Sequence, residues 1–180
     1  MKATGIVRRI DDLGRVVIPK EIRRSMRIRE GDPLEIYTDS DGEVIFKKYS
    51  PIGELSEFAS QYAEVLVKST EIPVIICDRD HCIAASGVSR KEVLERRVKP
   101  ELEDVTEARK AYCVRQGDAA RIHPLEGVDF SAAVIVPIIA SGDVCGSVIF
   151  GMPSESYTPT EHDVRLAQIA ANFLGKQMEE

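Results

Sequence analysis

A break in the hydrophobic pattern near residue 50 divides this chain into two segments that must fold differently. Residues 49–53 read Tyr-Ser-Pro-Ile-Gly, and the proline and glycine end a strand pattern just before a helical period begins. The sequence therefore predicts an α+β chain of two domains, with a small domain at 1–50, a linker at 51–55 and a larger α/β domain at 56–180.

The first segment is expected to form short strands. Two β-branched runs at 5–10 and 15–18 flank the turn sequence Asp-Asp-Leu-Gly, and the runs at 34–37 and 44–47 flank Asp-Ser-Asp-Gly, which is typical of a hairpin. About fifty residues of short strands bury too little apolar surface to be stable alone. Because this segment has no cysteine, we expect it to form a homodimer.

The second segment alternates helical periods with continuous apolar runs. A serine at 89 and a glutamate at 92 have the spacing of a capping box, and Thr158 or Thr160 is expected to cap the last helix. The predicted helices are 54–69, about 101–110 and 160–177, and the predicted strands are 73–78, 82–86, 132–139 and 144–150.

Charge is distributed unevenly along the chain. Residues 1–29 hold nine lysines and arginines against three acidic residues, a net charge of +6, whereas the whole chain carries −6. The remaining residues therefore sum to −12. An asymmetry of this size points to a polyanion-binding N-terminal end.

The cations gather on a predicted short helix that begins after Pro19 and runs to about residue 28. Spacing of i, i+3, i+4 and i+7 would place four of them on one helical face, where they could neutralise phosphates along a groove. A solvated charged face is the alternative, but only Glu21 lies close enough to pair with them. Adding two arginines from the preceding strands gives the predicted DNA contacts: Arg8, Arg15, Lys20, Arg23, Arg24 and Arg27.

Composition argues against several other classes of protein. The four cysteines, at 77, 82, 113 and 145, form no Cys-x-x-Cys pair, so we expect reduced thiols and neither a metal site nor a cofactor. No apolar run is long enough to span a bilayer, and the N-terminus does not resemble a secretion signal. We therefore expect a cytoplasmic, nucleoid-associated protein that binds no membrane.

The N-terminal motif resembles the AbrB family of transition-state regulators. The matching residues are Thr-Gly-Ile-Val-Arg at 4–8, Asp-Leu-Gly-Arg-Val-Val-Ile-Pro at 12–19 and Glu-Ile-Arg-Arg at 21–24, and the match extends to about residue 50. The resemblance implies a swapped-hairpin β-barrel dimer that binds double-stranded DNA. It assigns DNA contacts to Arg8, Arg15, Arg23 and Arg24, and implies that binding depends on DNA shape more than on a strict consensus.

The rest of the chain resembles a GAF domain. The resemblance rests on the order of elements, on Val-Pro-Ile at 136–138 and on Gly-Asp-Val-Cys-Gly-Ser-Val at 142–148. Together the two resemblances imply an activator and repressor of sporulation genes. They also imply a homotetramer assembled through helices 54–69 and 160–177. Whether the GAF-like domain binds a small molecule, and which one, stays open, because the signature linked with cyclic nucleotides is missing.

Two alternatives remain at this stage. The N-terminal fold also occurs in antitoxins, although their toxin-binding tails are short and poorly ordered, unlike the second segment here. Some GAF-like proteins are thiol enzymes, and Cys82 beside His81 is the one pair that could suggest such chemistry. The full core pattern of the second segment disfavours an antitoxin, and the sequence shows no nucleophile–base pair, Walker loop or metal cluster, so we expect a regulator and not an enzyme.

Overall fold

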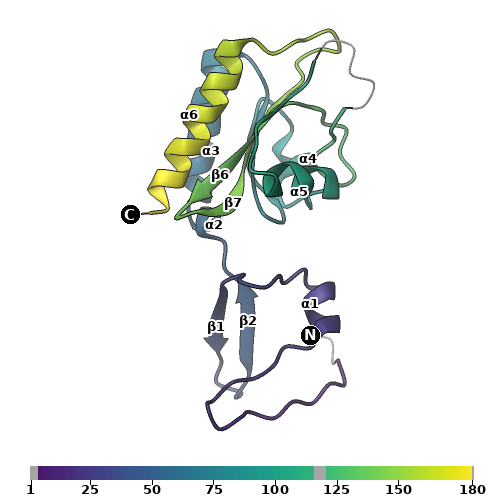
Figure 1. Ribbon diagram of the computed structural model, residues 1–180. Helices are drawn as coiled ribbons and strands as arrows, with labels where there is room; N and C mark the ends of the chain where they lie inside the picture. The colour runs from purple at the N-terminus through teal and green to yellow at the C-terminus, as the bar shows by residue number, and fades with distance from the viewer. Residues whose placement is uncertain (1–3, 116–120, 180) are drawn as a thin grey trace. The chain divides into compact units, whose positions relative to one another are not determined.

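The computed structural model describes residues 4–115 and 121–179 of this chain (Figure 1). The chain forms two compact units, Met1–Tyr49 and Ser50–Glu180. The first contains a two-stranded sheet and a short helix, and the second a five-stranded sheet with helices on both faces. The α+β fold class is therefore confirmed.

The elements follow in chain order. They are α1 (Lys20–Ser25), β1 (Leu34–Thr38), β2 (Val44–Lys48), α2 (Pro51–Glu54), α3 (Ser56–Thr70), β3 (Val74–Asp78), β4 (Cys82–Ser86), α4 (Arg90–Val93), α5 (Pro100–Glu107), β5 (Tyr112–Cys113), β6 (Ala132–Ala140), β7 (Asp143–Gly151) and α6 (Glu161–Gln177).

The predicted hairpin of the first unit is confirmed. β1 and β2 pair antiparallel, with Leu34 opposite Lys48. The side chain of Asp39 accepts hydrogen bonds from the N–H groups of Asp41 and Glu43, both at 3.0 Å, and Gly42 takes a positive φ of 82°. These two features make the turn, because an aspartate can bond to the backbone two residues ahead and glycine has no Cβ to oppose a positive φ.

The two runs predicted as strands at 5–10 and 15–18 are not strands in the single chain. Their apolar side chains are largely solvent-accessible, with exposed fractions that reach 87% at Val7 and 74% at Val17. A β-strand is stabilised by backbone hydrogen bonds to a neighbour and by burial of one face. Within the described part of one chain these runs have no such neighbour, so their strand-forming sequence is left without a partner.

Helix α1 is shorter than the sequence predicted. It ends at Ser25 rather than near residue 28, because Arg27 adopts a left-handed backbone with φ of 52°. Met26, which the helical spacing would bury, is 57% exposed, whereas Ile22 is partly buried.

The segment expected to be a linker forms helix α2. The hydroxyl of Ser50 caps it by accepting a hydrogen bond from the N–H of Gly53 at 3.1 Å, and it donates one to the carboxylate of Asp78 at 3.0 Å. Ile52 is fully buried in the core of the second unit. Residues 51–54 are therefore part of that unit and are not an extended connection.

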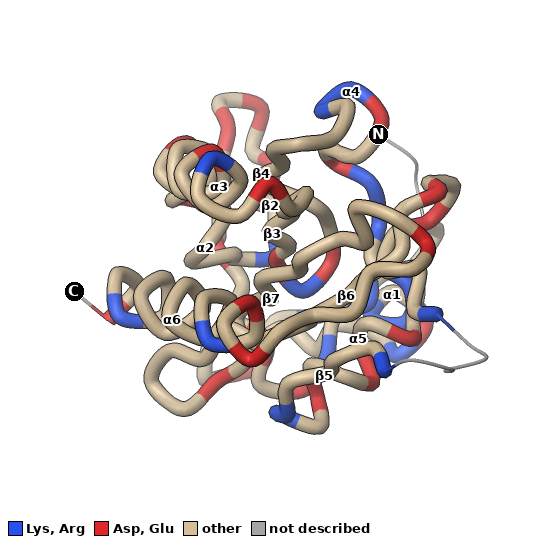
Figure 2. Tube along the Cα trace, turned by 90° about the horizontal axis from the view of Figure 1, so that it is seen from above, with Lys and Arg blue, Asp and Glu red and all other residues tan. Residues whose placement is uncertain are grey.

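The second unit is a three-layered structure. All pairings in its sheet are antiparallel, in the order β4-β3-β7-β6-β5, and the apolar runs predicted as strands supply its four longer strands. Figures 1 and 2 show α3 and α6 side by side over one face of the sheet. On the other face α4 and α5 cover a second core cluster, so both faces are buried and the strands read as continuous apolar runs.

A close contact holds α6 against the sheet. A Cβ added to Gly175 would lie 2.3 Å from the carbonyl oxygen of Ile139 on β6. Only glycine therefore allows this approach of helix to strand. The interior positions of the helix include Ala167, Ala171 and Leu174, as its spacing predicted, but Gln168 is exposed.

Several boundaries differ from the prediction in the second unit. Ser89 precedes α4, but its side chain makes no capping hydrogen bond, and the helix has only four residues. Helix α5 ends at Glu107, since Arg109 takes a positive φ of 55°. Strand β5 was missed because it has only two residues, which are too few to show alternation.

Thr160, one of the two predicted caps, begins α6 with a complete capping box. Its hydroxyl accepts a hydrogen bond from the N–H of Asp163, and the carboxylate of Asp163 accepts hydrogen bonds from the Thr160 N–H at 2.7 Å and from the Tyr157 hydroxyl at 2.8 Å. Burial alone would raise the pKa of Asp163, but the hydrogen bonds from Thr160 and Tyr157 outweigh it and lower the pKa below its ordinary value.

Asp163→Asn should destabilise the second unit by about 1 kcal/mol at neutral pH, as loss of a helix cap does. A carboxyl with a lowered folded pKa contributes stability above its unfolded pKa, and this contribution is lost as the pH falls through the folded pKa. The difference in stability between variant and wild type should thus shrink in acid. Thermal unfolding of both proteins at pH 7 and at about pH 3 measures this difference. The same difference at both pH values would contradict the assignment.

Candidate nucleic-acid interface

The short helix of the first unit presents a group of cations to solvent. Pro19 precedes α1, and its fixed φ of −57° suits a helix start. Lys20, Arg23 and Arg24 follow at helical spacing and are all exposed, so they lie on one face of the helix. Two of the three are arginines in the last turn, where a positive charge also complements the helix dipole.

Arg27 does not extend this face. It lies beyond the end of α1 in the left-handed conformation, so the i+7 spacing that grouped it with the other three does not apply. Its carbonyl oxygen accepts a hydrogen bond from Lys48 Nζ at 2.9 Å. Arg27 is partly buried, and the structure gives it a role in ending the helix.

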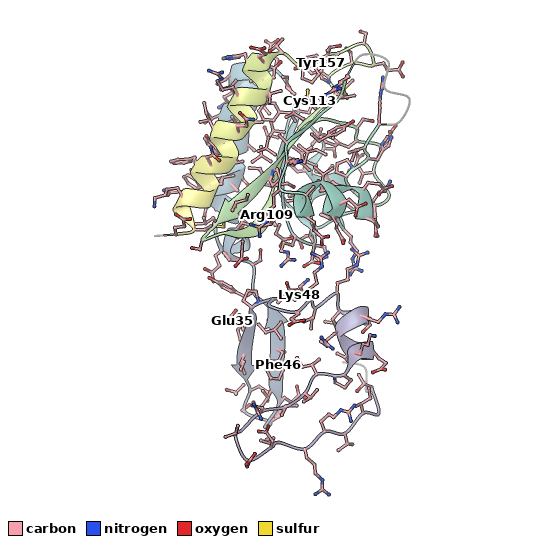
Figure 3. All side chains as sticks on the ribbon, in the orientation of Figure 1. Glu35, Phe46, Lys48, Arg109, Cys113 and Tyr157 are labelled. Atoms are coloured by element: carbon pink, nitrogen blue, oxygen red, sulfur yellow. The ribbon has the colours of Figure 1, made fainter. Side chains whose placement is uncertain are left out.

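Lys48, labelled in Figure 3, links the end of α1 to the hairpin together with Asp32. Besides its bond to Arg27, Lys48 Nζ lies 3.9 Å from the carboxylate of Asp32, whose side chain is only 4% exposed. The same carboxylate accepts the N–H of Arg29 at 2.8 Å. Sequence reasoning missed both residues, since Asp32 lies in the loop before β1 and Lys48 lies at the end of β2, 16 positions later, and nothing in the local pattern pairs them.

Arg8 and Arg15 lie in the two extended segments that precede the helix. Both are exposed, and the side chain of Arg15 has an exposed fraction of 68%. Arg15 Nε donates a hydrogen bond to Asp11 Oδ2 at 2.8 Å. Sequence reasoning treated Asp11 as part of a turn and did not pair it with Arg15, because i, i+4 ion pairs are expected on helices and this segment is not helical.

Chemically, these side chains are suited to bind phosphate. Lysine ammonium and arginine guanidinium groups donate charge-assisted hydrogen bonds to phosphate oxygens, and the planar guanidinium can also meet the edge of guanine with two parallel bonds. The donor groups are accessible to solvent in five exposed residues: Arg8, Arg15, Lys20, Arg23 and Arg24.

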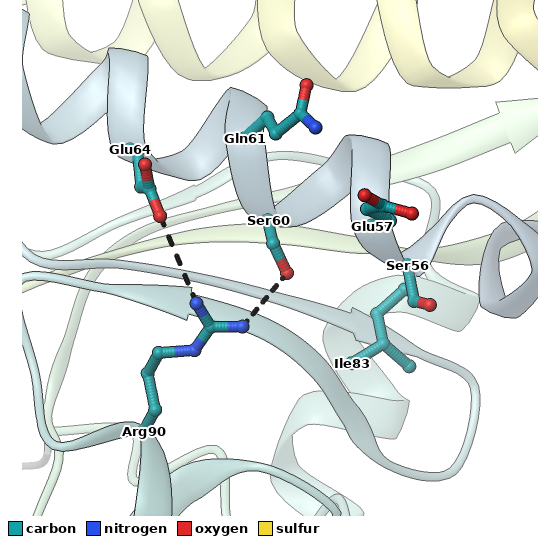
Figure 4. Close-up of a pocket in the computed structure, with 7 residues that line it drawn as sticks. All are labelled: Ser56, Glu57, Ser60, Gln61, Glu64, Ile83 and Arg90. Carbon is teal, nitrogen blue, oxygen red and sulfur yellow. Dashed lines mark hydrogen bonds and ion pairs between the residues drawn. The ribbon is translucent and has the colours of Figure 1, made fainter.

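A shallow groove lies on the surface of the second unit (Figure 4). Its volume is about 410 Å³, and Arg90 spans it with Nη2 at 3.4 Å from Ser60 Oγ and Nη1 at 3.9 Å from Glu64 Oε1. The lining is mainly polar and comes from α3, β4 and the start of α4: Ser56, Glu57, Ser60, Gln61, Glu64, Ile83 and Arg90.

The cysteines give little support to thiol catalysis. Cys77 and Cys82 face each other across β3 and β4 and are fully buried. A hydrogen bond with Cys82, together with burial, raises the pKa of the Cys77 thiol well above its usual range, and burial also raises the pKa of Cys145. Thiols with raised pKa values are poor nucleophiles at neutral pH, because the thiolate is the reactive form.

Residues 4–115 and 121–179 contain no group of three or more histidine, cysteine or acidic side chains arranged to hold a metal ion. They also contain no helix with the length and hydropathy needed to cross a membrane.

Comparison with known proteins identifies both parts of the chain. Residues 54–179 match the family described as stage V sporulation protein T C-terminal, transcription factor. Residues 7–53 match the family described as antidote-toxin recognition MazE, bacterial antitoxin.

Two relatives from Bacillus subtilis (strain 168) align with the chain. Stage V sporulation protein T is 50% identical over 182 residues, covering 100% of both chains. Transition state regulatory protein AbrB is 63% identical over 51 residues, which are 28% of this chain and 52% of AbrB.

A solved structure supports the fold of the second unit. The GAF domain of a phosphoenolpyruvate-protein phosphotransferase from Coxiella burnetii superposes with a TM-score of 0.53 at 19% identity, covering 69% of this chain and 82% of that domain. The second unit thus has the GAF fold that the sequence predicted, and the N-terminal sequence is of the AbrB type. Since the match in sequence to stage V sporulation protein T runs from end to end, the chain belongs to the stage V sporulation protein T family of transcription factors.

Proposed function

We propose that this chain binds double-stranded DNA through residues 1–50 and regulates transcription from there, activating some sporulation genes and repressing others. The observation that carries the proposal is the set of exposed cations on and before α1, of which Lys20, Arg23 and Arg24 share one helical face. Arg8 and Arg15 complete the contact set, and Arg27, which is off this face, contributes from the end of the helix. The protein acts in the cytoplasm, on the nucleoid.

The DNA-binding form is a homodimer whose N-terminal hairpins are swapped between chains. In one chain, six apolar side chains between positions 5 and 18 are 40% to 87% exposed: Ile6, Val7, Ile10, Leu13, Val16 and Val17. Leaving this much apolar surface in water is unfavourable, since each large side chain gains about 1.5–3 kcal/mol on burial. Pairing with the same segments of a second chain would complete the strands and cover these residues.

Two dimers join into a homotetramer through α3 and α6. Phe58, Tyr62 and Phe173 form an aromatic cluster between these helices, with ring centroids 5.5 to 6.2 Å apart. Beside it Val65 and Ile169 are 56% and 53% exposed, so an apolar strip runs along the outer side of the helix pair. A strip of this kind packs well in a helical bundle.

Ile169→Glu is expected to convert the tetramer to dimers, because it places a charge in the strip that would be buried on assembly. Sedimentation equilibrium of the full-length protein measures the mass. The neighbouring exposed residue supplies a matched control, Gln168→Glu, which adds the same charge outside the strip and should remain tetrameric. Tetramers in both variants would exclude this surface as the interface.

A small-molecule ligand of the GAF-like unit stays a prediction. The groove beside Arg90 would suit a small zwitterion, with the guanidinium receiving an anionic group and Glu57 or Glu64 a cationic one. The antitoxin alternative has support from the family match of the N-terminal segment. It does not account for a second unit with its own core and a family match over residues 54–179.

Binding of the full-length protein to duplex DNA tests the proposed function. Fluorescence anisotropy with a labelled duplex at low salt should give a saturable increase, and an unlabelled duplex should compete. If the signal does not rise at micromolar protein, where even non-specific DNA binding is measurable, the proposal fails.

A further inference from the structure

Three hydrogen bonds of Asp11, two with Arg15 and one with Leu13, fix the backbone of the turn between the two extended segments. Its Oδ1 accepts the N–H groups of Leu13 at 3.0 Å and of Arg15 at 2.7 Å. Its own N–H donates to the carbonyl oxygen of Arg15 at 3.1 Å. One carboxylate oxygen is thus committed to the backbone.

The other oxygen of Asp11 holds the Arg15 side chain. Oδ2 accepts the Nε–H of Arg15 at 2.8 Å, while the arginine side chain stays 68% exposed and the aspartate side chain is 37% exposed. Among the described residues the terminal Nη atoms of Arg15 donate no hydrogen bond. The guanidinium is therefore held at one edge, and its four terminal N–H donors remain available to a ligand.

We infer that Asp11 is a positioning residue that presents the Arg15 guanidinium for a two-pronged contact with DNA. The inference rests on the proposed DNA-binding function. A long flexible side chain loses rotamer freedom when it binds, and holding Nε in place beforehand lowers that cost. It also fixes the plane of the guanidinium, which determines whether two parallel bonds to a phosphate or a guanine can form.

If Asp11 acted only through its charge, removing it would have the opposite effect on DNA binding. Hydrogen bonds from the backbone and side chain of Arg15 hold the pKa of Asp11 below its ordinary value, so the carboxylate is charged at neutral pH. A negative charge near phosphates repels them, so its removal alone would tighten DNA binding. If Asp11 instead acts through Arg15, its removal weakens binding.

The experiment compares Asp11→Asn with Asp12→Asn in the full-length protein, each alone and in an Arg15→Ala background. Asparagine keeps an oxygen that can accept the two backbone N–H groups, but it lacks the second oxygen that holds Nε. Asp12 is the next residue in the sequence, is exposed and forms no ion pair with the described residues, so it controls for charge. Thermal unfolding and sedimentation of each variant confirm that fold and assembly are intact.

Asp11→Asn is expected to weaken binding to one fixed duplex about tenfold, which is the size of effect usual for two side chains in contact. In the Arg15→Ala background, Asp11→Asn should cause no further loss of affinity. Asp12→Asn should bind as tightly as wild type or more tightly. The inference is overturned if Asp11→Asn binds like Asp12→Asn, or if its loss is equally large without Arg15. Absence of binding by the wild type would instead refute the proposed function itself, and the inference with it.

Discussion

Replacing both Arg23 and Arg24 with alanine is expected to weaken DNA binding by at least about a hundredfold at moderate salt, because hydrogen bonds from charged groups contribute about 1.5–3 kcal/mol each. A dimer loses four guanidinium groups in this variant. Since each phosphate contact contributes about 0.9 to the salt dependence of binding, the slope of log Kd against log salt should fall by about 3.6. Both arginines are exposed in the last turn of α1, so the oligomer should remain intact.

A matched control removes the same number of charges elsewhere. Lys68 and Lys176 are exposed lysines on α3 and α6, and replacing both with alanine lowers the net charge equally without touching the first unit. This control should keep nearly the wild-type affinity and slope. If the Arg23 and Arg24 variant binds as the control does, the contact assignment is wrong.

Phe150→Ala should be the most destabilising single change considered, at about 3–5 kcal/mol, which is the usual cost of removing a buried phenylalanine. Phe150 is fully buried on β7, which pairs with both β3 and β6 at the centre of the sheet. The side chain belongs to the cluster under α3 and α6, so its removal leaves a cavity between sheet and helices. Domain stabilities are only about 5–15 kcal/mol, so this loss is a large fraction of the total.

Thermal unfolding followed by circular dichroism measures the effect, and the melting temperature should fall by about 10 °C or more. Ile139→Ala supplies the comparison, because Ile139 lies on the adjacent strand β6 but is 39% exposed. Its loss should cost clearly less. Equal destabilisation by the two variants would mean that the core cluster around Phe150 is not the main source of stability.

The sequence predicted those parts of the fold in which the pattern is local. The strands at 74–78 and 132–140 are nearly continuous apolar runs, the strand at 143–151 follows the second of them after a short turn, and the cap at Thr160 is a short-range motif with Asp163. The segment at 51–54 shows where such reasoning fails. Proline and glycine indicate a linker, but proline is also favoured at the start of a helix. Only the tertiary contact of Ile52 with the core decides between a linker and a helix.

Part of the candidate interface could also be predicted from the sequence. The position of Arg23 and Arg24 on one helical face follows from their spacing, whereas the position of Arg27 off that face follows from its left-handed backbone, which the sequence pattern did not indicate. The hydrogen bond from Lys48 to the Arg27 carbonyl, between residues 21 positions apart, accompanies that conformation. Contacts between residues so far apart in the sequence depend on how the hairpin packs against the helix, so the local sequence pattern does not predict them.

The salt dependence of duplex DNA binding by the full-length wild-type protein tests the central claim most directly. Kd is measured by anisotropy at a series of salt concentrations with one labelled duplex. Five exposed cations from each chain of a dimer could contact phosphates, so the account predicts a steep slope, up to about 9 in log Kd against log salt. A slope near zero, or no binding at low salt, would contradict the claim that residues 1–50 bind DNA through these cations.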